Sequence, residues 1–525
     1  MSEEMMATKP APRSPHASVL RSWPASVRQR LGVGVMRQHL GLAAITCAAL
    51  GFYLLHSLED QARYLTTGYD LGIFDQAVRA YAHFQAPIVA LKGADYNIFG
   101  DHFHPIIAVL APLYWLWDDP VALLIAQAVL TAASIPVVYR FARRRAAERM
   151  SLLIAAAYGF GWPVQALIDF DFHEIAFATP LAALAIDALD RRDDRRLLLW
   201  CGLLLLVRED MGVLVAMIGL LRLAQRRPPR WPAGVMIFGG LAMYLLTTAV
   251  IIPHFATGHA FAYNNQFGSL GSSVPAAIGT IVTRPWHAVA VFFTPAVKAR
   301  TLALLVVPLG LLCFRSRYAL LALPLLAELF FNSRHFLWTA MFHYSALPWV
   351  ILVLAMIDGA DRLGLFDEDR RAVLARRALA ALLVATPLAL IAFGGKMEVG
   401  RLTHVRNSYR DQPADWQRSA SAVVAWLPDN VCITADSRLA PHLTRRDYTS
   451  VPQANTPRPD FYALDTFAPD TGGNPPAPTP AAVFTQAVAA GYHVAYRAGT
   501  FVVLQSPTYS GPSSVCEPLG SGKAG

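Results

Sequence analysis

The chain has 525 residues, of which 55% are hydrophobic and only 15% are charged, and its formal net charge is +9. The mean hydropathy of +0.38 excludes a water-soluble enzyme and indicates a multi-pass membrane protein. The arginines lie in short clusters between apolar runs, as the positive-inside rule predicts, so the positive charge does not indicate a nucleic-acid partner.

Long apolar runs predict the membrane spans. Residues 1–37 are rich in Arg, Pro and Ser and are expected to form a disordered, basic, cytoplasmic N-terminus. The run 38–57 lacks the cleavage site of a signal peptide and is expected to be a retained helix. With it, about eleven transmembrane helices are expected. The other runs are 120–141, 150–168, 174–189, 197–207, 211–224, 233–252, 301–314, 318–331, 340–358 and 378–394. Several are shorter than the roughly 20 residues of a full crossing, which is typical of helices that end at a protein-lined cavity.

The segment 104–117 is apolar but short, and it contains two prolines. If it lies in the interface, the basic clusters 143–149 and 191–196 both fall on the cytoplasmic side. We therefore expect an interfacial helix here. The loops rich in acids and histidines, and the tail after residue 395, then lie outside.

The composition becomes polar near residue 396, which predicts a separate extracytoplasmic α/β domain over 396–525 with a loose C-terminal tail. Residues 431–439 are expected to form a strand, residues 480–491 a helix, and the last two strands a hairpin about Ala498 and Gly499. Cys432 and Cys516 would face an oxidising compartment. They form either a disulfide or two free thiols.

The first outer loop contains an expected amphipathic helix over 71–84, which can lie on the membrane surface. Its apolar residues recur at helical spacing: Leu71, Phe74, Val78 and Tyr81. Asp70 stands at its start, where it is either an N-cap or a base that accepts a proton from a sugar hydroxyl. Asp75 is either the partner of Arg79 one turn on or the reserve candidate for the base. Tyr69 is expected to contact substrate.

Two polar clusters follow on the same expected side. The first, at the end of the loop, is a candidate substrate-binding group of Asp101, His102 and His104. The second is a candidate site for a divalent metal, Mn or Mg, and comprises Asp169, Asp171, His173 and Glu174. Helix caps and surface hydrogen bonds are the alternative. Ionisable groups this close to a bilayer favour a functional role.

A charged group of Arg208, Glu209 and Asp210 interrupts two short apolar runs. It is either a self-compensating ion pair at a helix break or a substrate site in which Arg208 meets a lipid phosphate. His343 and Tyr344 are candidate cavity-lining residues, although a lone histidine is more often structural.

The motifs GYDLGIFDQ at 68–76, DHFHPI at 101–106 and PLYWLW at 112–117 resemble a bacterial multi-pass family called simply "predicted membrane protein". That family is similar to the C-type (GT-C) glycosyltransferase superfold, whose enzymes use polyprenyl-phosphate sugars. The resemblance implies a catalytic carboxylate in the first outer loop, matched by Asp70 or Asp75, surface helices at 71–84 and 104–117, and a second acidic motif at Asp169 and Asp171. Tyr69-Asp70 departs from the Asp-Glu pair of many members.

Fold and resemblance together predict an all-α polytopic membrane domain over 38–395 that acts as a glycosyltransferase in the bacterial plasma membrane. It would move a sugar from a polyprenyl-phosphate donor to a glycan, lipid or protein acceptor of the cell envelope. A transporter or flippase is the rival, but its polar groups should lie at the bilayer midplane, whereas here they gather on one side. A non-catalytic envelope-assembly protein on the same scaffold is the third possibility.

Overall fold

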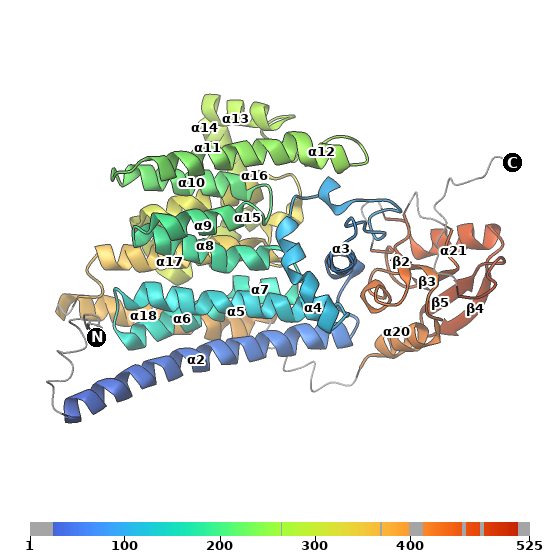
Figure 1. Ribbon diagram of the computed structural model, residues 1–525, viewed down its shortest axis with the longest axis horizontal. Coiled ribbons are helices and arrows are strands. Elements are labelled where there is room, and N and C mark those ends of the chain that lie inside the picture. The colour runs from blue at the N-terminus through green and yellow to red at the C-terminus, as the bar shows by residue number, and fades with distance from the viewer. Residues whose placement is uncertain are drawn as a thin grey trace, which may run out of the picture.

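The computed structural model describes residues 25–263, 265–367, 370–397, 413–453, 458–472 and 477–512. Figure 1 shows a bundle of helices with a smaller sheet domain at one end. The first loop, with α3, lies between the two.

Five helical segments in the described part of the chain are long and apolar enough to cross a bilayer: His39–Ala62, Val121–Arg143, Glu148–Asp169, Trp231–Phe255 and His343–Arg362. A sixth crossing is possible if the bent pair α13 (Val274–Thr283) and α14 (Pro285–Phe293), which meet at 111°, counts as one span. These five or six candidates do not confirm the expected count of about eleven. Several expected spans form short helices, such as α9 (Asp194–Leu204) and α10 (Met211–Ala224). At 1.5 Å per residue, a helix of this length is shorter than the roughly 30 Å hydrocarbon core.

The bundle is built around α5 (Val121–Arg143), α8 (Ile175–Asp190) and α17 (Ala346–Arg362), which pack against one another. Among the five candidate spans of the described residues, His343–Arg362, which contains α17, is the most enclosed, with 94% of its apolar stretch buried. Helices with more exposed surface surround this core, such as the segments His39–Ala62 and Trp231–Phe255. The remaining elements are α2 (Ala25–Ala62), α6 (Glu148–Gly159), α7 (Trp162–Asp169), α11 (Trp231–Leu246), α12 (Ile252–Phe255), α15 (Ala296–Val306), α16 (Leu323–Phe331) and α18 (Arg370–Met397).

The first loop contains the expected helix, α3 (Ile73–Ala82), preceded by an irregular turn at Gly68–Gly72. Its apolar residues are not available to lie on lipid, because Leu71, Phe74 and Val78 are buried in the protein core. The apolar segment 104–117 forms a 3-10 turn at Pro105–Leu110 and the short helix α4 (Ala111–Leu116), which packs against α3. A helical segment this short agrees with the expectation that 104–117 does not span.

The C-terminal domain contains one five-stranded sheet in the order β2-β1-β3-β5-β4. β1 (Cys432–Ala435) pairs in parallel with β2 (Tyr448–Ser450) and β3 (Phe461–Asp465), while β4 (His493–Ala498) and β5 (Phe501–Gln505) form an antiparallel hairpin. The expected helix and hairpin are confirmed by α21 (Pro480–Ala489) and β4–β5, and the strand expected over 431–439 is shorter, since β1 ends at Ala435. α20 (Asp415–Trp426) covers the hairpin, with Trp426 stacked on Tyr496 at 5.1 Å between ring centroids.

The expectations of a disordered N-terminus and of a disulfide near the C-terminus can be compared with the structure only in part. α2 begins at Ala25, so residues 25–37 are helical where a disordered tail was expected, and residues 1–24 lie outside the described residues. Cys432 is disulfide-bonded, and its expected partner Cys516 lies outside the described residues. Cys47, Cys201 and Cys313 are free.

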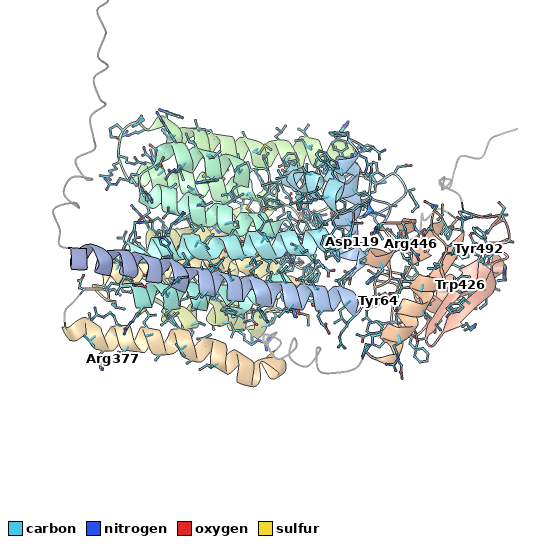
Figure 2. All side chains as sticks on the ribbon, turned by 60° about the horizontal axis from the view of Figure 1, so that its bottom comes forward. Tyr64, Asp119, Arg377, Trp426, Arg446 and Tyr492 are labelled. Carbon is cyan, nitrogen blue, oxygen red and sulfur yellow. The ribbon has the colours of Figure 1, made fainter. Side chains whose placement is uncertain are left out.

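The sheet domain packs directly on the bundle end. Figure 2 labels Tyr64 and Asp119 on the bundle, close to the side of the sheet domain that carries Arg446. The Tyr64 ring lies 3.9 Å from that of His442, and Arg445 is 3.5 Å from Asp119. Tyr64 belongs to the apolar core of the sheet domain, although it lies just beyond α2. The two parts therefore share packing as well as chain connections.

Candidate active site

A cavity of about 490 Å³ opens at the bundle end nearest the sheet domain, and its lining combines apolar and polar residues. Apolar lining comes largely from α13 and α16, including Ala277, Ile281, Leu325 and Leu329. The polar lining residues are Tyr69, Asp70, Lys92, Asp101, His102, His104, His173, Glu174, Arg208, Glu209, Asp210, Tyr263, Gln266, Glu328, Arg334, His343 and Tyr344. An amphipathic molecule would match this mixed lining.

Asp70 lines the cavity from an unusual backbone conformation, with φ 95° and ψ −83°. Such a geometry costs a non-glycine residue of order 1–3 kcal/mol and persists only where its surroundings hold it. Asp70 is not the N-cap of α3, since that position is Gly72. Burial raises the pKa of the Asp70 carboxyl, although His173 and Lys92 oppose the effect. A strained, half-buried carboxyl beside a cavity is suited to proton transfer.

Asp75, the reserve candidate for the base, does not line the cavity. Its fully buried carboxylate accepts two hydrogen bonds from Arg79, at 2.9 and 3.0 Å, and one from the Tyr114 hydroxyl at 2.7 Å. The alternative interpretation, a pair with Arg79, is the one the structure shows. We therefore assign Asp75 to holding α3 against α4 and not to the chemistry.

The cluster at the end of the first loop forms an ion-pair network on the cavity wall. Asp101 pairs with Lys92 and accepts a hydrogen bond from Tyr263 at 2.7 Å. Burial opposes the charge on Asp101, but Lys92 and His102 outweigh burial and lower its pKa. His102 contacts Glu209 at 2.7 Å. Burial would lower the pKa of His102, but Glu209 and Asp101 overcome it and raise this pKa to about 9. His102 therefore carries a positive charge at neutral pH.

His104 differs from its neighbour. It also lines the cavity and is buried, but burial dominates and lowers its pKa to about 4. His104 is thus neutral at neutral pH and provides a ring nitrogen without a charge. The two histidines of one short motif therefore bring different protonation states to one cavity.

Arg208 forms the ion pair with a neighbouring carboxylate that was one of the two interpretations of the sequence. Its guanidinium donates to both carboxylate oxygens of Asp210 at 2.7 Å, and it lies 3.7 Å from Glu174. All three residues line the cavity together with Glu209. A phosphate that approached Arg208 would compete with Asp210 for the same donors.

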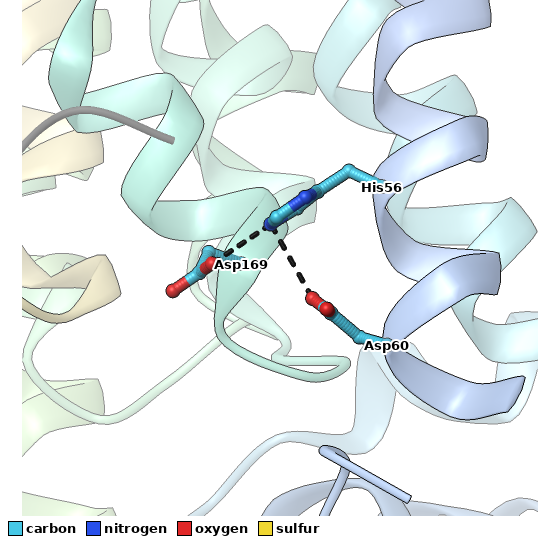
Figure 3. Close-up of side chains that lie close together, drawn as sticks. All are labelled: His56, Asp60 and Asp169. Carbon is cyan, nitrogen blue, oxygen red and sulfur yellow. Dashed lines mark hydrogen bonds and ion pairs between the residues drawn. The ribbon is translucent and has the colours of Figure 1, made fainter. Parts of the chain in front are cut away.

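The four residues of the expected metal site point in three directions. Asp169 contacts His56 at 2.8 Å, and Asp60 lies 3.3 Å from the same ring nitrogen (Figure 3). Asp171 accepts from the Thr67 amide at 2.8 Å and from its hydroxyl at 2.9 Å. Only His173 and Glu174, 2.8 Å apart, line the cavity. The sequence prediction of one site for all four is therefore wrong. Their side chains separate because the segment after α7 leaves the helix at Phe170.

Among the described residues, one group has potential ligand atoms within 4.8 Å of one another, and it is His56, Asp60 and Asp169. None of these three lines the cavity. Sequence reasoning missed His56 and Asp60, although their spacing of four residues places them on one face of a helix.

His343 and Tyr344 both line the cavity, as expected, and the His343 ring stacks on His173 at 3.9 Å. The sequence analysis overlooked Lys92, Tyr263 and Arg334. Lys92 is the only lysine of the first loop, and this could have indicated it as a candidate binding residue. Arg334 lies some 240 residues away in the chain, and only the fold brings the two to one cavity.

Comparison with known proteins agrees with the membrane fold. Residues 62–471 match the family model described as "Predicted membrane protein (DUF2079)". The chain belongs to this family. No curated protein matches the sequence. Among solved structures, ArnT from Cupriavidus metallidurans bound to undecaprenyl phosphate matches with a TM-score of 0.51 at 14% identity, covering 90% of this chain and 99% of that one. The apo structure of the same protein matches at 0.49 and 14%, with coverage of 89% and 98%. This family member thus has an ArnT-like fold and is a multi-pass membrane protein.

Proposed function

We propose that the protein is an integral membrane glycosyltransferase that transfers a sugar from a polyprenyl-phosphate donor to an acceptor in the cell envelope. The observation that carries the proposal is Asp70, a strained and half-buried carboxyl that lines a cavity with both polar and apolar residues. The apolar lining suits a polyprenyl chain, and the polar lining suits a sugar and a phosphate. An ArnT-like fold supports the proposal, since that protein was solved with undecaprenyl phosphate bound.

In the proposed reaction, an acceptor hydroxyl oxygen attacks the anomeric carbon of the donor sugar. The bond between that carbon and the phosphate oxygen breaks, and its electron pair leaves with the polyprenyl phosphate. Asp70 takes the hydroxyl proton as the new bond forms. Its raised pKa brings it closer to the working pH than an ordinary carboxyl, which favours this role.

The departing phosphate needs positive charge. Lys92 is paired with Asp101 and Arg208 with Asp210, whereas no carboxylate ion pair of Arg334 is present among the described residues. The Arg334 guanidinium lies 4.8 Å from the centre of the Tyr263 ring, which leaves it on the cavity wall. We therefore assign the phosphate to Arg334, with Arg208 as a neighbouring charge. His343 and Tyr344, on the same wall, would contact the sugar.

The orientation that suits this reaction places the N-terminus in the cytoplasm and the sheet domain outside, in a bacterial plasma membrane crossed about eleven times. The short helices would then act as partial spans around the cavity. A reporter fused after residue 395 should be active only outside the cytoplasm, and one at residue 147 only inside. An outside signal at residue 147 would make 104–117 a span and reverse this part of the proposal.

A divalent ion, Mn or Mg, is a separate proposal. The two carboxylates and one imidazole of His56, Asp60 and Asp169 provide suitable donors. Because they lie off the cavity, an ion there would hold α2 against α7, and no step of the transfer involves it. Metal analysis of the purified protein should find about one ion per chain that is lost in His56→Gln. Equal metal content in both proteins would exclude this site.

The function is tested by mass spectrometry of lipid-linked sugars and envelope glycans from a deletion strain. A glycosyltransferase should lose one glycan product and accumulate one polyprenyl-phosphate sugar. Return of both levels on expression of the native chain, but not of Asp70→Asn, is the expected result. Unchanged glycans with an altered distribution of lipid between leaflets would favour a flippase instead.

A further inference from the structure

The loop that carries Asp70 is held from two sides at consecutive amides. The Thr67 amide donates to Asp171 of the bundle at 2.8 Å. The next amide, of Gly68, donates to the sheet domain, to the Ser437 carbonyl at 2.6 Å and to its hydroxyl at 3.1 Å. Asp70 follows two residues later with its positive φ. Both parts of the molecule therefore determine where the strained turn begins.

Ser437 is itself firmly placed. It follows β1 at the carboxyl edge of the parallel strands, and it is buried. Its amide donates to the Thr471 carbonyl at 3.2 Å. Gly472 lies directly behind it, so close that a Cβ there would come within 2.5 Å of the Ser437 Cβ. Ligands of open α/β sheets bind at this edge. Here the edge receives the loop of the transmembrane domain.

The fit at Gly68 leaves no room for a side chain. A Cβ on Gly68 would lie 2.9 Å from the Ala440 Cβ, below any normal contact, and 3.3 Å from the end of the Leu91 side chain. The backbone at Gly68 is one that alanine can adopt, since its φ is not positive. Space alone therefore requires glycine, and the atom that limits the space belongs to the sheet domain.

Further contacts extend the same interface along α3. Gln76 donates to the Thr449 carbonyl of β2 at 2.8 Å, and Arg79 donates to the Thr444 carbonyl at 3.0 Å. Farther along the first loop, the Leu91 carbonyl accepts a hydrogen bond from Gln453 of the sheet domain at 2.6 Å. The interface thus runs from the strained turn to the segment beside Lys92.

From these contacts we propose that the sheet domain is a positioning element for the active site, and that Ser437 is its positioning residue for Asp70. This rests on the proposed function, in which Asp70 is the base. Ser437 does not line the cavity and touches no substrate. It acts by fixing the Gly68 amide, so that the strain at Asp70 is held and its carboxylate meets the acceptor hydroxyl.

The test is a pair of substitutions across the interface. Gly68→Ala should push the loop away from Ala440 and lower product formation on the order of tenfold to a hundredfold, since displacements near 1 Å can have such effects. Ala440→Gly removes the opposing methyl group. The double variant Gly68→Ala with Ala440→Gly should recover most of the lost rate, because contacting residues are not additive. Ala440→Gly alone provides the reference rate. Gly51→Ala is the matched control, because nothing lies within 4 Å of its added methyl group.

Each variant is the full chain, compared for glycan product in the deletion strain, binding of undecaprenyl phosphate, and thermal unfolding in detergent. Positioning predicts that Gly68→Ala keeps lipid binding and loses far more product than any fall in its melting temperature accounts for. Native product from Gly68→Ala, a loss that Ala440→Gly does not restore, or a parallel loss of lipid binding would each overturn the inference. If Asp70→Asn keeps full product, the proposed function fails. If Asp70→Asn is inactive and Gly68→Ala is not, only the positioning role fails.

Discussion

Substituting asparagine at Asp70 and at Asp75 should separate chemistry from stability within one short segment. Both changes remove one negative charge and keep the side-chain volume. Asp70 lines the cavity, and burial raises its pKa. Asp75 is enclosed by Arg79 and Tyr114. Because the two sites differ in surroundings, we expect opposite outcomes from the same substitution.

The magnitudes follow from those surroundings. Loss of a general base typically lowers a rate on the order of a hundredfold to ten-thousandfold, which is the expectation for Asp70→Asn. Neutralising a desolvated carboxylate relieves an unfavourable charge, so the melting temperature of this variant should stay the same or rise. In Asp75→Asn, Arg79 loses one buried anionic partner but keeps Asp118 at 3.2 Å, so the cost should stay below the roughly 3–5 kcal/mol of a buried charge left without a partner. Activity per folded molecule should remain near native.

The assay measures product in the complemented deletion strain together with thermal unfolding of each purified variant. The pH profile gives a further check. A base must be deprotonated, so activity should fall as the pH drops through the pKa of Asp70, and the fall should occur at higher pH than for an ordinary carboxyl. Full product from Asp70→Asn would refute the assignment. An inactive but stable Asp75→Asn would contradict the assignment of Asp75 to a structural role and would make it a candidate for the base.

Two further predictions concern charges on the cavity wall. Arg334→Gln should weaken binding of undecaprenyl phosphate on the order of tenfold to a hundredfold, as expected for loss of a charge-assisted contact. Arg334→Lys should retain part of the binding affinity. An unchanged affinity of Arg334→Gln in a lipid-binding titration would exclude Arg334 as the phosphate site. The pKa of His102 is raised to about 9 by its carboxylate partners, so its contribution to stability is complete below about pH 6.5 and is lost as the pH rises through 9. Melting temperatures of the native chain and His102→Gln should therefore converge across this interval, and parallel curves would contradict the pair.

The sequence predicted local elements well where a periodic pattern and a turn residue coincide. α21 ends before Gly491, whose φ of +91° suits glycine, and the β4–β5 hairpin turns at Gly499 with φ +54°. Helix α3 was recognised from its apolar spacing. Its surroundings were not, because the same apolar face can be buried by lipid or by α4, and the spacing is identical in both cases.

The count of spans illustrates a different limit. Hydropathy identifies apolar runs such as 197–207 and 211–224, but their helices are too short for a full crossing. The sequence contains no direct measure of how such segments stack around a cavity. For the same reason Arg334 and Lys92, distant in the chain, could not be assigned to one wall from composition alone.

The motif DFDFHE at residues 169–174 shows why close spacing in the sequence wrongly predicted a single metal site. Four ionisable residues within six positions favoured one metal site, yet the chain leaves α7 at Phe170 and Asp171 adopts a φ of +25°. Asp169 then faces α2, Asp171 faces the loop of Asp70, and His173 and Glu174 face the cavity. The motif therefore connects three parts of the molecule. Asp171 holds Thr67 from the bundle while Ser437 holds Gly68 from the sheet domain, so residues of both parts of the molecule fix the two amides that precede Tyr69 and Asp70.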